Sequence, residues 1–199
     1  LWPSDSSHPI PNWIQQRDVS KPPCLLCNDR EHLFFYLERG CLEFSPSLSC
    51  LKSLHAPDYM VLTIDSPDSD LSPTIGVALA TRKVLTGLQL PSFIKTDGRA
   101  GFHIYIPLDT KSDFKKSNLA ATYISKLIRL KIPDLVTLNA AEEMTYGKVS
   151  LNYSLNADGQ SITAPYSLVQ GSQPTVAPPL HWDEVQHGLR IEDFSINTI

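Results

Sequence analysis

Residues 93–109, FIKTDGRAGFHIYIPLD, contain two apolar segments separated by a short polar stretch with glycines. Phe93 and Ile94 are typical of a short strand, and the segment 101–107 alternates apolar with polar side chains, as a half-buried strand does. Gly98 and Gly101 suit a tight turn, because glycine adopts backbone conformations that other residues avoid. This stretch therefore predicts two strands joined by a short turn.

The sequence on both sides of this stretch predicts the remaining elements. Apolar residues at helical spacing indicate helices, and short apolar or alternating runs indicate strands. Gly40 marks the end of one helix and Pro73 the start of another. The predicted elements are helices at 31–39, 73–87, 115–130 and 181–187, and strands at 59–64 and 149–155. Their order indicates an α/β or α+β fold with a mixed sheet, in a single domain over residues 1–199.

The helix predicted at 115–130 is amphipathic, with four large apolar residues on one face: Leu119, Tyr123, Leu127 and Leu130. The only basic cluster of the chain lies at its start: Lys111, Lys115 and Lys116. We interpret this cluster as the solvated beginning of the helix.

The composition is that of an ordinary globular protein, with 42% hydrophobic and 19% charged residues. The net charge of -4 counts against tight non-specific binding of nucleic acid, because phosphate neutralisation requires a basic surface. The apolar runs are far shorter than the roughly 20 residues that span a bilayer, and no signal peptide is visible. A cytoplasmic location without membrane contact is therefore expected.

The four cysteines allow two interpretations. Cys24 and Cys27 form a C-x-x-C pair, whereas Cys41 and Cys50 are farther apart than the second close pair of a typical zinc site. Buried reduced thiols are the predicted state, and structural zinc is the alternative.

Two segments resemble the polymerase domain of bacterial ligase D, a member of the archaeo-eukaryotic primase-polymerase superfamily. Residues 93–109 are similar to the family's K-T-S-G-x-x-G-x-H-x-Y-x-P-L, and residues 147–185 to its G-K-V-F-x-D-x-x-Q-N, T-x-A-P-Y-S-x-R and W-D-E-L motifs. Weaker similarities at 11–14, 27–49 and 190–198 extend the resemblance over most of the chain. An N-terminal portion that family members possess has no counterpart here, and it carries basic residues for the DNA 5′-phosphate.

The resemblance implies an α+β fold in which helices flank a mixed, largely antiparallel sheet, the RRM-like palm core of this superfamily. It also implies a part in DNA repair by non-homologous end joining, with nucleotides and DNA ends as ligands. Other repair proteins, or fused ligase and nuclease domains, are the implied protein partners. Family members transfer nucleotides with two Mg²⁺ or Mn²⁺ ions. Two aspartates in a D-x-D pattern and a third on a neighbouring strand hold these ions.

Carried over to this sequence, the metal-binding set keeps one carboxylate. The D-x-D positions fall on Thr63 and Asp65, and the third position falls on Asn152. Asp65 is therefore the predicted catalytic and metal-binding residue. One aspartate with a threonine and an asparagine is a weak ligand set for a hard divalent cation. Weak or absent metal binding, and impaired or lost catalysis, are the expected consequences.

Other family positions divide into retained and replaced residues. The retained ones are predicted to bind nucleotide: Lys95, Thr96, Gly98, His103 and Ser167. Asn156 also keeps its family position. The family's H-P-W histidine, K-T-S-G serine and the arginine after A-P-Y-S are replaced by Ser45, Asp97 and Val169.

Each retained residue also has a structural interpretation. His103 is equally well explained as a partly buried structural histidine, and Lys95 as the partner of Asp97 in the turn. Gly98 serves turn geometry, and Ser167 packs its loop together with Tyr166. The residues alone leave these alternatives open.

The stretch TIDSPDSD, residues 63–70, offers a second carboxylate set. Asp68 and Asp70 themselves form a D-x-D, and with Asp65 they make up a rearranged metal site in the alternative hypothesis of an active nucleotidyltransferase. Aspartates in a turn before a helix more often cap backbone N–H groups. We therefore favour solvated turn carboxylates. A third hypothesis keeps the fold but gives the pocket to another phosphorylated ligand.

Overall fold

The computed structural model describes residues 10–14, 16–17, 24–66, 68, 70–109, 112–138, 147–170 and 174–199. The chain divides into two compact units, residues 1–44 and residues 45–199, and each is described by itself. The prediction of a single domain over the whole chain remains a prediction. None of the helices that the structure describes is long and apolar enough to cross a membrane.

The first unit consists of a small β-ribbon and one helix. Strands β1 (Gln16–Arg17) and β2 (Cys24–Leu25) pair in antiparallel fashion, and α1 spans Arg30–Glu38. The Asp29 side chain caps the helix by accepting a hydrogen bond from the backbone N–H of His32. Gly40 has a φ of 76°, so the predicted glycine at the end of this helix is confirmed. Ile14, Phe35 and Tyr36 form its buried core.

The second unit is built on a six-stranded sheet in the order β10-β4-β5-β3-β7-β6. All neighbouring strands are antiparallel except β6 and β7, so the expected mixed, largely antiparallel sheet of an α+β fold is confirmed. The strands are β3 (Tyr59–Asp65), β4 (Phe93–Thr96), β5 (Gly101–Pro107), β6 (Val136–Thr137), β7 (Val149–Asn152) and β10 (Pro179–Leu180).

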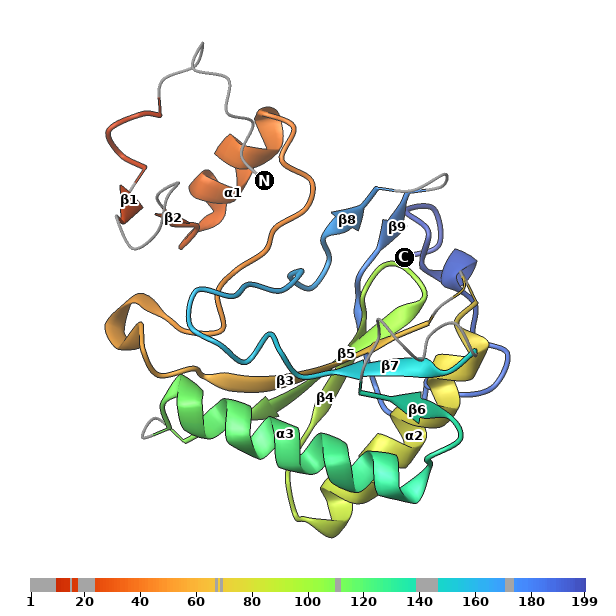
Figure 1. The fold of residues 1–199 in the computed structure, drawn as a ribbon. Coiled ribbons are helices and arrows are strands. Elements are labelled where there is room, and N and C mark those ends of the chain that lie inside the picture. The colour runs from red at the N-terminus through yellow and green to blue at the C-terminus, as the bar shows by residue number, and fades with distance from the viewer. Residues whose placement is uncertain are drawn as a thin grey trace. The chain divides into compact units, whose positions relative to one another are not determined.

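Two long helices cover one face of this sheet, α2 (Ser72–Gly87) and α3 (Phe114–Lys131) (Figure 1). The alternation of β3 places Met60, Leu62 and Ile64 in the main core with residues of both helices. Val61, Thr63 and Asp65 therefore project from the opposite face. The remaining elements are short: η1 (Leu51–Ser53), η3 (Ile191–Phe194), and the pair β8 (Leu168–Val169) and β9 (Thr175–Val176).

The structure corrects two sequence predictions on secondary structure and adds a strand that was not predicted. Residues 181–187 form turns and not a helix, and the backbone N–H of His181 donates to the Glu184 carboxylate at 2.6 Å. Strand β10, just before these turns, was not predicted. The strand expected to reach residue 155 ends at Asn152, whose side-chain oxygen accepts a hydrogen bond from the backbone N–H of Ser154 at 2.8 Å and starts a turn.

The orientation of α3 differs from what its apolar pattern would suggest. Leu119, Tyr123 and Leu130 are exposed, with 71%, 64% and 77% of their surface accessible. The buried face of α3 carries instead Phe114, Ser117, Ala121, Ile124, Ser125 and Ile128. Several of these residues are small, which allows the helix to approach the sheet closely.

The cysteine prediction is wrong for two of the four residues. Cys27 and Cys50 are exposed, Cys41 is half-buried, and all three are free thiols. Burial, together with nearby Asp29 and Cys41, still raises the pKa of Cys27 above its ordinary value, which favours the protonated thiol. The Cys24 side chain lies outside the described residues, so the zinc alternative remains a prediction.

Candidate functional site

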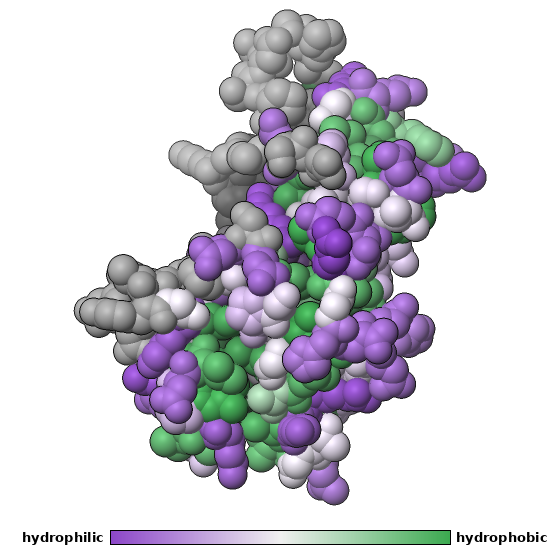
Figure 2. Space-filling model, turned by 90° about the vertical axis from the view of Figure 1, so that its right-hand side faces the viewer, coloured by the Kyte–Doolittle hydropathy of each residue, from purple (hydrophilic) through white to green (hydrophobic). Residues whose placement is uncertain are grey.

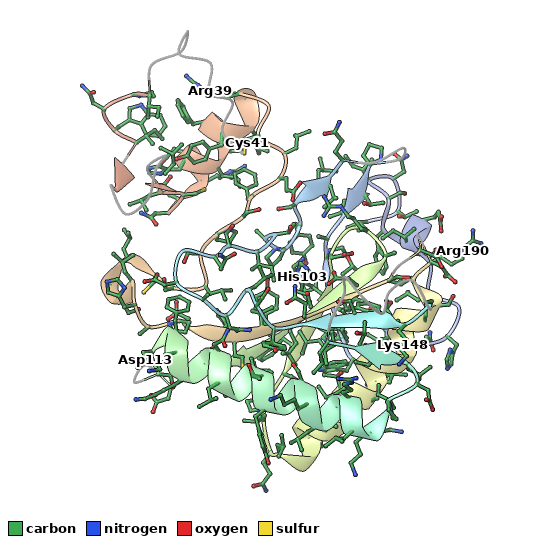
Figure 3. All side chains as sticks on the ribbon, in the orientation of Figure 1. Arg39, Cys41, His103, Asp113, Lys148 and Arg190 are labelled. Atoms are coloured by element: carbon green, nitrogen blue, oxygen red, sulfur yellow. The ribbon has the colours of Figure 1, made fainter. Side chains whose placement is uncertain are left out.

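The sheet aligns four of the predicted site residues in one row. The strand register pairs Lys95 with His103, His103 with Thr63, and Thr63 with Asn152, across β4, β5, β3 and β7. Residues paired directly on neighbouring strands project from the same face of a sheet. Figure 3 shows His103 on the face turned away from α2 and α3. These side chains, far apart in the sequence, therefore share one surface of the sheet.

Asp65 lies on the same face, two residues beyond Thr63, and pairs with Gly101 and Ser150. The Thr63 hydroxyl donates a hydrogen bond to the Asp65 carboxylate at 3.0 Å. Burial raises the pKa of Asp65 above its ordinary value, the Thr63 hydrogen bond partly offsets this, and the nearby Asp97 carboxylate raises it further. Asp65 is thus a half-buried carboxylate that accepts a hydrogen bond from a neutral hydroxyl.

The side chains of Asn152 and Asn156 both form hydrogen bonds with backbone groups. The Asn152 oxygen is engaged by Ser154, as described above. Asn156 is fully buried; its amide nitrogen donates to the carbonyls of Val61 and Tyr153 at 2.7 and 2.8 Å, and its oxygen accepts from the Val61 N–H at 2.7 Å. Strand β7 ends at Asn152, so it does not reach the level of Val61. The Asn156 side chain replaces the missing strand there, because it bonds both the N–H and the carbonyl of Val61. Sequence reasoning missed this structural role, although Asn156 was noted as retained.

Lys95 and His103 are both buried at the other end of the row, with 2% and 7% of their surface exposed. The Lys95 ammonium donates a hydrogen bond to the carbonyl of Thr96 at 2.7 Å. Burial, assisted by the charges of Lys95 and Arg99, lowers the pKa of His103 to about 3. His103 is therefore a neutral imidazole at physiological pH, and its Nδ1 atom is a buried polar atom without a hydrogen-bond partner among the described residues.

The turn after β4 is closed by Asp97. Its carboxylate accepts hydrogen bonds from the backbone N–H groups of Arg99 and Gly101, at 2.6 and 3.0 Å. Gly98 has a φ of 78°, and a Cβ atom there would overlap the side chain of Val169. Val169 is itself buried, so an apolar side chain fills the space beside this turn. The structural interpretation of Gly98 accounts for its presence.

Thr96 and Ser167 hold the C-terminal part of the chain against this turn. The backbone N–H of Thr96 donates to the carbonyl of Pro178 at 3.1 Å, and the N–H of Ala177 donates to the carbonyl of Ser167 at 3.1 Å. Both residues are buried. Tyr166, by contrast, is exposed and has a φ of 62°, an uncommon conformation for an aromatic residue. These contacts describe a packed loop, and they leave the predicted nucleotide contacts of Thr96 and Ser167 as predictions.

Asp68 and Asp70 lie in the exposed turn between β3 and α2. The Asp70 carboxylate accepts a hydrogen bond from the backbone N–H of Ser72 at 2.9 Å, and this bond lowers the pKa of Asp70. The backbone N–H of Asp68 donates to the Ser66 hydroxyl at 3.3 Å. Within the described part of the chain, no group of three or more His, Cys, Asp or Glu side chains is placed to hold a metal ion. The observed contacts of Asp70 are those of a turn carboxylate.

Comparisons with known proteins point to a single family. A model of the family described as LigD, primase-polymerase domain, matches residues 3–199. The bifunctional non-homologous end joining protein LigD of Bacillus subtilis is 27% identical over 191 residues, which are 95% of this chain and 31% of that protein. The multifunctional LigD of Mycolicibacterium smegmatis is 27% identical over 192 residues, 88% of this chain and 24% of that protein. The chain thus spans about a third or less of these relatives.

The fold also has a counterpart among solved structures. A solved structure, described as the polymerase domain from Mycobacterium tuberculosis ligase D in complex with DNA, matches with a TM-score of 0.78 and 23% sequence identity. The match covers 92% of this chain and 70% of that chain. The palm-type fold expected from the sequence is thereby confirmed. Because the family model covers nearly all of the sequence, the chain belongs to the LigD primase-polymerase domain family.

Proposed function

We propose that this chain serves non-homologous end-joining repair as a LigD-type polymerase domain whose nucleotidyl transfer is impaired or lost. In this proposal it acts as a nucleotide- or nucleic-acid-binding module, or as a scaffold for other repair proteins or fused ligase and nuclease domains. The supporting observation is the composition of the row on the sheet. Thr63 and Asn152 stand on either side of the β3–β7 pairing, where the family resemblance expects carboxylates.

The donor set fits a pair of divalent cations poorly. Hard cations such as Mg²⁺ are held by carboxylates, and Asp65 is the only residue of the three that carries one. The Thr63 hydroxyl already donates to Asp65, and the Asn152 oxygen already accepts from Ser154. No catalytic step through a metal ion is therefore assigned to this chain.

The remaining residues suit binding better than catalysis. Lys95 supplies a buried positive charge, and a lysine ammonium is a common phosphate ligand. His103 adds a neutral imidazole beside it, with an unengaged Nδ1 atom. A phosphate group of a nucleotide, or of another phosphorylated ligand, is the chemistry that this pair would accept. Asp65 and Asp97 on the same side would weaken the binding of highly charged triphosphates.

Primer extension with Mn²⁺ and labelled nucleotides tests the loss of activity. We expect no incorporation by the natural chain, and incorporation to appear in the double variant Thr63→Asp, Asn152→Asp if these positions alone removed the chemistry. Incorporation by the natural chain that Asp65→Ala abolishes would contradict the proposal. If Asp68→Ala or Asp70→Ala also abolished it, the alternative site on Asp65, Asp68 and Asp70 would be supported instead.

Titration of the purified chain with a nucleoside triphosphate, inorganic phosphate and gapped DNA tests the binding role. We expect saturable binding of a phosphate-containing ligand that Lys95→Gln weakens, and that Lys148→Gln, outside the row, leaves unchanged. Binding of phosphate alone would support the third hypothesis of a different phosphorylated ligand. Flat curves for all three ligands would leave only the scaffold role.

A further inference from the structure

Helix α3 carries two apolar faces, and the structure covers only one of them. Phe114, Ala121, Ile124 and Ile128 are buried, and α3 packs against α2 and β3. The second face is a row of four residues at spacings of four, four and three, here named the α3 ridge: Leu119, Tyr123, Leu127 and Leu130. Three of these four residues are exposed, by 64% or more of their surface.

The α3 ridge is unusual for a solvated surface. A continuous row of large apolar side chains along a helix normally marks a face that packs against another element. Single exposed leucines need no explanation, whereas a contiguous patch indicates an interaction site. The ridge extends over 11 residue steps, which correspond to about 16 Å along the helix axis. On a neighbouring side of the molecule, shown in Figure 2, apolar side chains also reach the surface, and some of them gather at the lower left of the view.

The charges beside the α3 ridge indicate the charge of a partner that would bind there. Helix α3 contains Lys115, Lys116, Lys126, Arg129 and Lys131, and no acidic residue. The first three of these lysines are exposed, and the helical repeat of about 100° places them within about 60° of the ridge. Because the whole chain has a net charge of -4, this helix is a local positive surface on a negative protein. An attractive partner must therefore be acidic as well as apolar.

We propose that the α3 ridge is a docking surface for an acidic amphipathic helix of a partner protein. About three helical turns with leucine-like side chains on one side would cover the ridge, and glutamates or aspartates at the margins would pair with Lys115, Lys116 and Lys126. DNA would satisfy the lysines but offers no apolar surface for the leucines. A membrane-bound helix buries a broad apolar face, whereas α3 exposes a single row and is fixed to the sheet by its other side.

The proposed surface is separate from the site on the sheet. The α3 helix lies on the face of the sheet opposite to His103 (Figures 1 and 3), so a docked helix would not compete with a ligand in that site. The inference therefore stands whether or not the chain retains nucleotidyl transfer.

Nuclear magnetic resonance of the ¹⁵N-labelled chain tests the proposal with a defined probe, an 18-residue helical peptide that carries leucine on one face and glutamate on the other. We expect saturable shifts of backbone amide signals in α3. The double variant Leu119→Gln, Leu130→Gln should weaken binding at least tenfold, as expected from the loss of two buried leucines. The control Leu88→Gln, a partly exposed leucine at the end of α2, should leave binding unchanged. Thermal unfolding of each variant checks that the fold is intact.

A charge reversal distinguishes specific docking from non-specific apolar binding. The triple variant Lys115→Glu, Lys116→Glu, Lys126→Glu should no longer bind the glutamate peptide. It should instead bind the same peptide with lysine in place of glutamate. The proposal is overturned if the glutamate peptide gives no saturable shifts, or if the ridge variants bind it as the natural chain does. It is also overturned if α3 signals respond to a 20-base-pair DNA duplex, or to vesicles of phosphatidylserine and phosphatidylcholine, but not to the peptide.

Discussion

Replacement of Asn156 by alanine is expected to destabilise the second unit strongly. The Asn156 side chain is fully buried and makes three hydrogen bonds of 2.7–2.8 Å, to the N–H and carbonyl of Val61 and to the carbonyl of Tyr153. Each such bond contributes about 1 kcal/mol net, and its loss leaves a buried backbone group without a partner. Asn156→Ala should therefore lower the free energy of unfolding by about 3 kcal/mol.

Urea denaturation followed by the fluorescence of Trp182 measures this loss, because Trp182 is the only tryptophan in residues 45–199. Trp2 and Trp13 are replaced by phenylalanine in the background protein to isolate the signal. Asn152→Ala is the matched control: it removes a single hydrogen bond at an exposed turn, and about 1 kcal/mol or less is expected. If Asn156→Ala cost no more than Asn152→Ala, the assignment of Asn156 as a substitute for strand pairing would be wrong.

Asn156→Asp adds a pH-dependent test of the same contacts. The new carboxylate would still accept from the Val61 N–H, but an ionised oxygen would face the carbonyls of Val61 and Tyr153. Burial and these carbonyls would raise the pKa of Asp in the folded state above its unfolded value of about 3.9. The variant should therefore approach the stability of the natural chain at low pH and lose stability as the pH rises from about 4 to the folded-state pKa. A stability deficit that is constant between pH 4 and pH 8 would refute this reasoning.

Three further predictions concern the site itself. Gly98→Ala should destabilise the chain by more than about 2 kcal/mol, because backbone strain at positive φ adds to the overlap with Val169. The control is Gly159→Ala: Gly159 has the same φ of 78° but open space around it, so a parallel urea titration should show the cost of the strain alone. Asp65→Asn should raise the melting temperature at pH 7 but not at pH 3, since a raised pKa means that the folded state disfavours the charged form; equal effects at both pH values would count against a buried charge. The ring signals of His103 should not titrate between pH 5 and pH 8, because its pKa is lowered to about 3; a midpoint near 6.5 in an NMR titration would show that the ring is solvated.

Local patterns were sufficient to predict most of the long elements. The helices α1 and α2 and the strands β3 and β5 agree with the predicted segments within a few residues, because apolar periodicity, Gly40 and Pro73 act within one element. The short strand β10 had no such signal. Its two residues are in a strand only because they pair with Lys95 and Ile94, about 85 positions earlier in the chain.

The sequence by itself therefore determined the element order, the amphipathic character of α3 and the residue types of the candidate site. Only the tertiary structure decided which apolar face of α3 is covered, because both faces are apolar and the smaller side chains of one, Ser117, Ala121 and Ser125, permit closer packing on the sheet. It also decided that Lys95, His103, Thr63 and Asn152 form one row. Strand register sets such a row, and a shift of one residue would send each side chain to the opposite face.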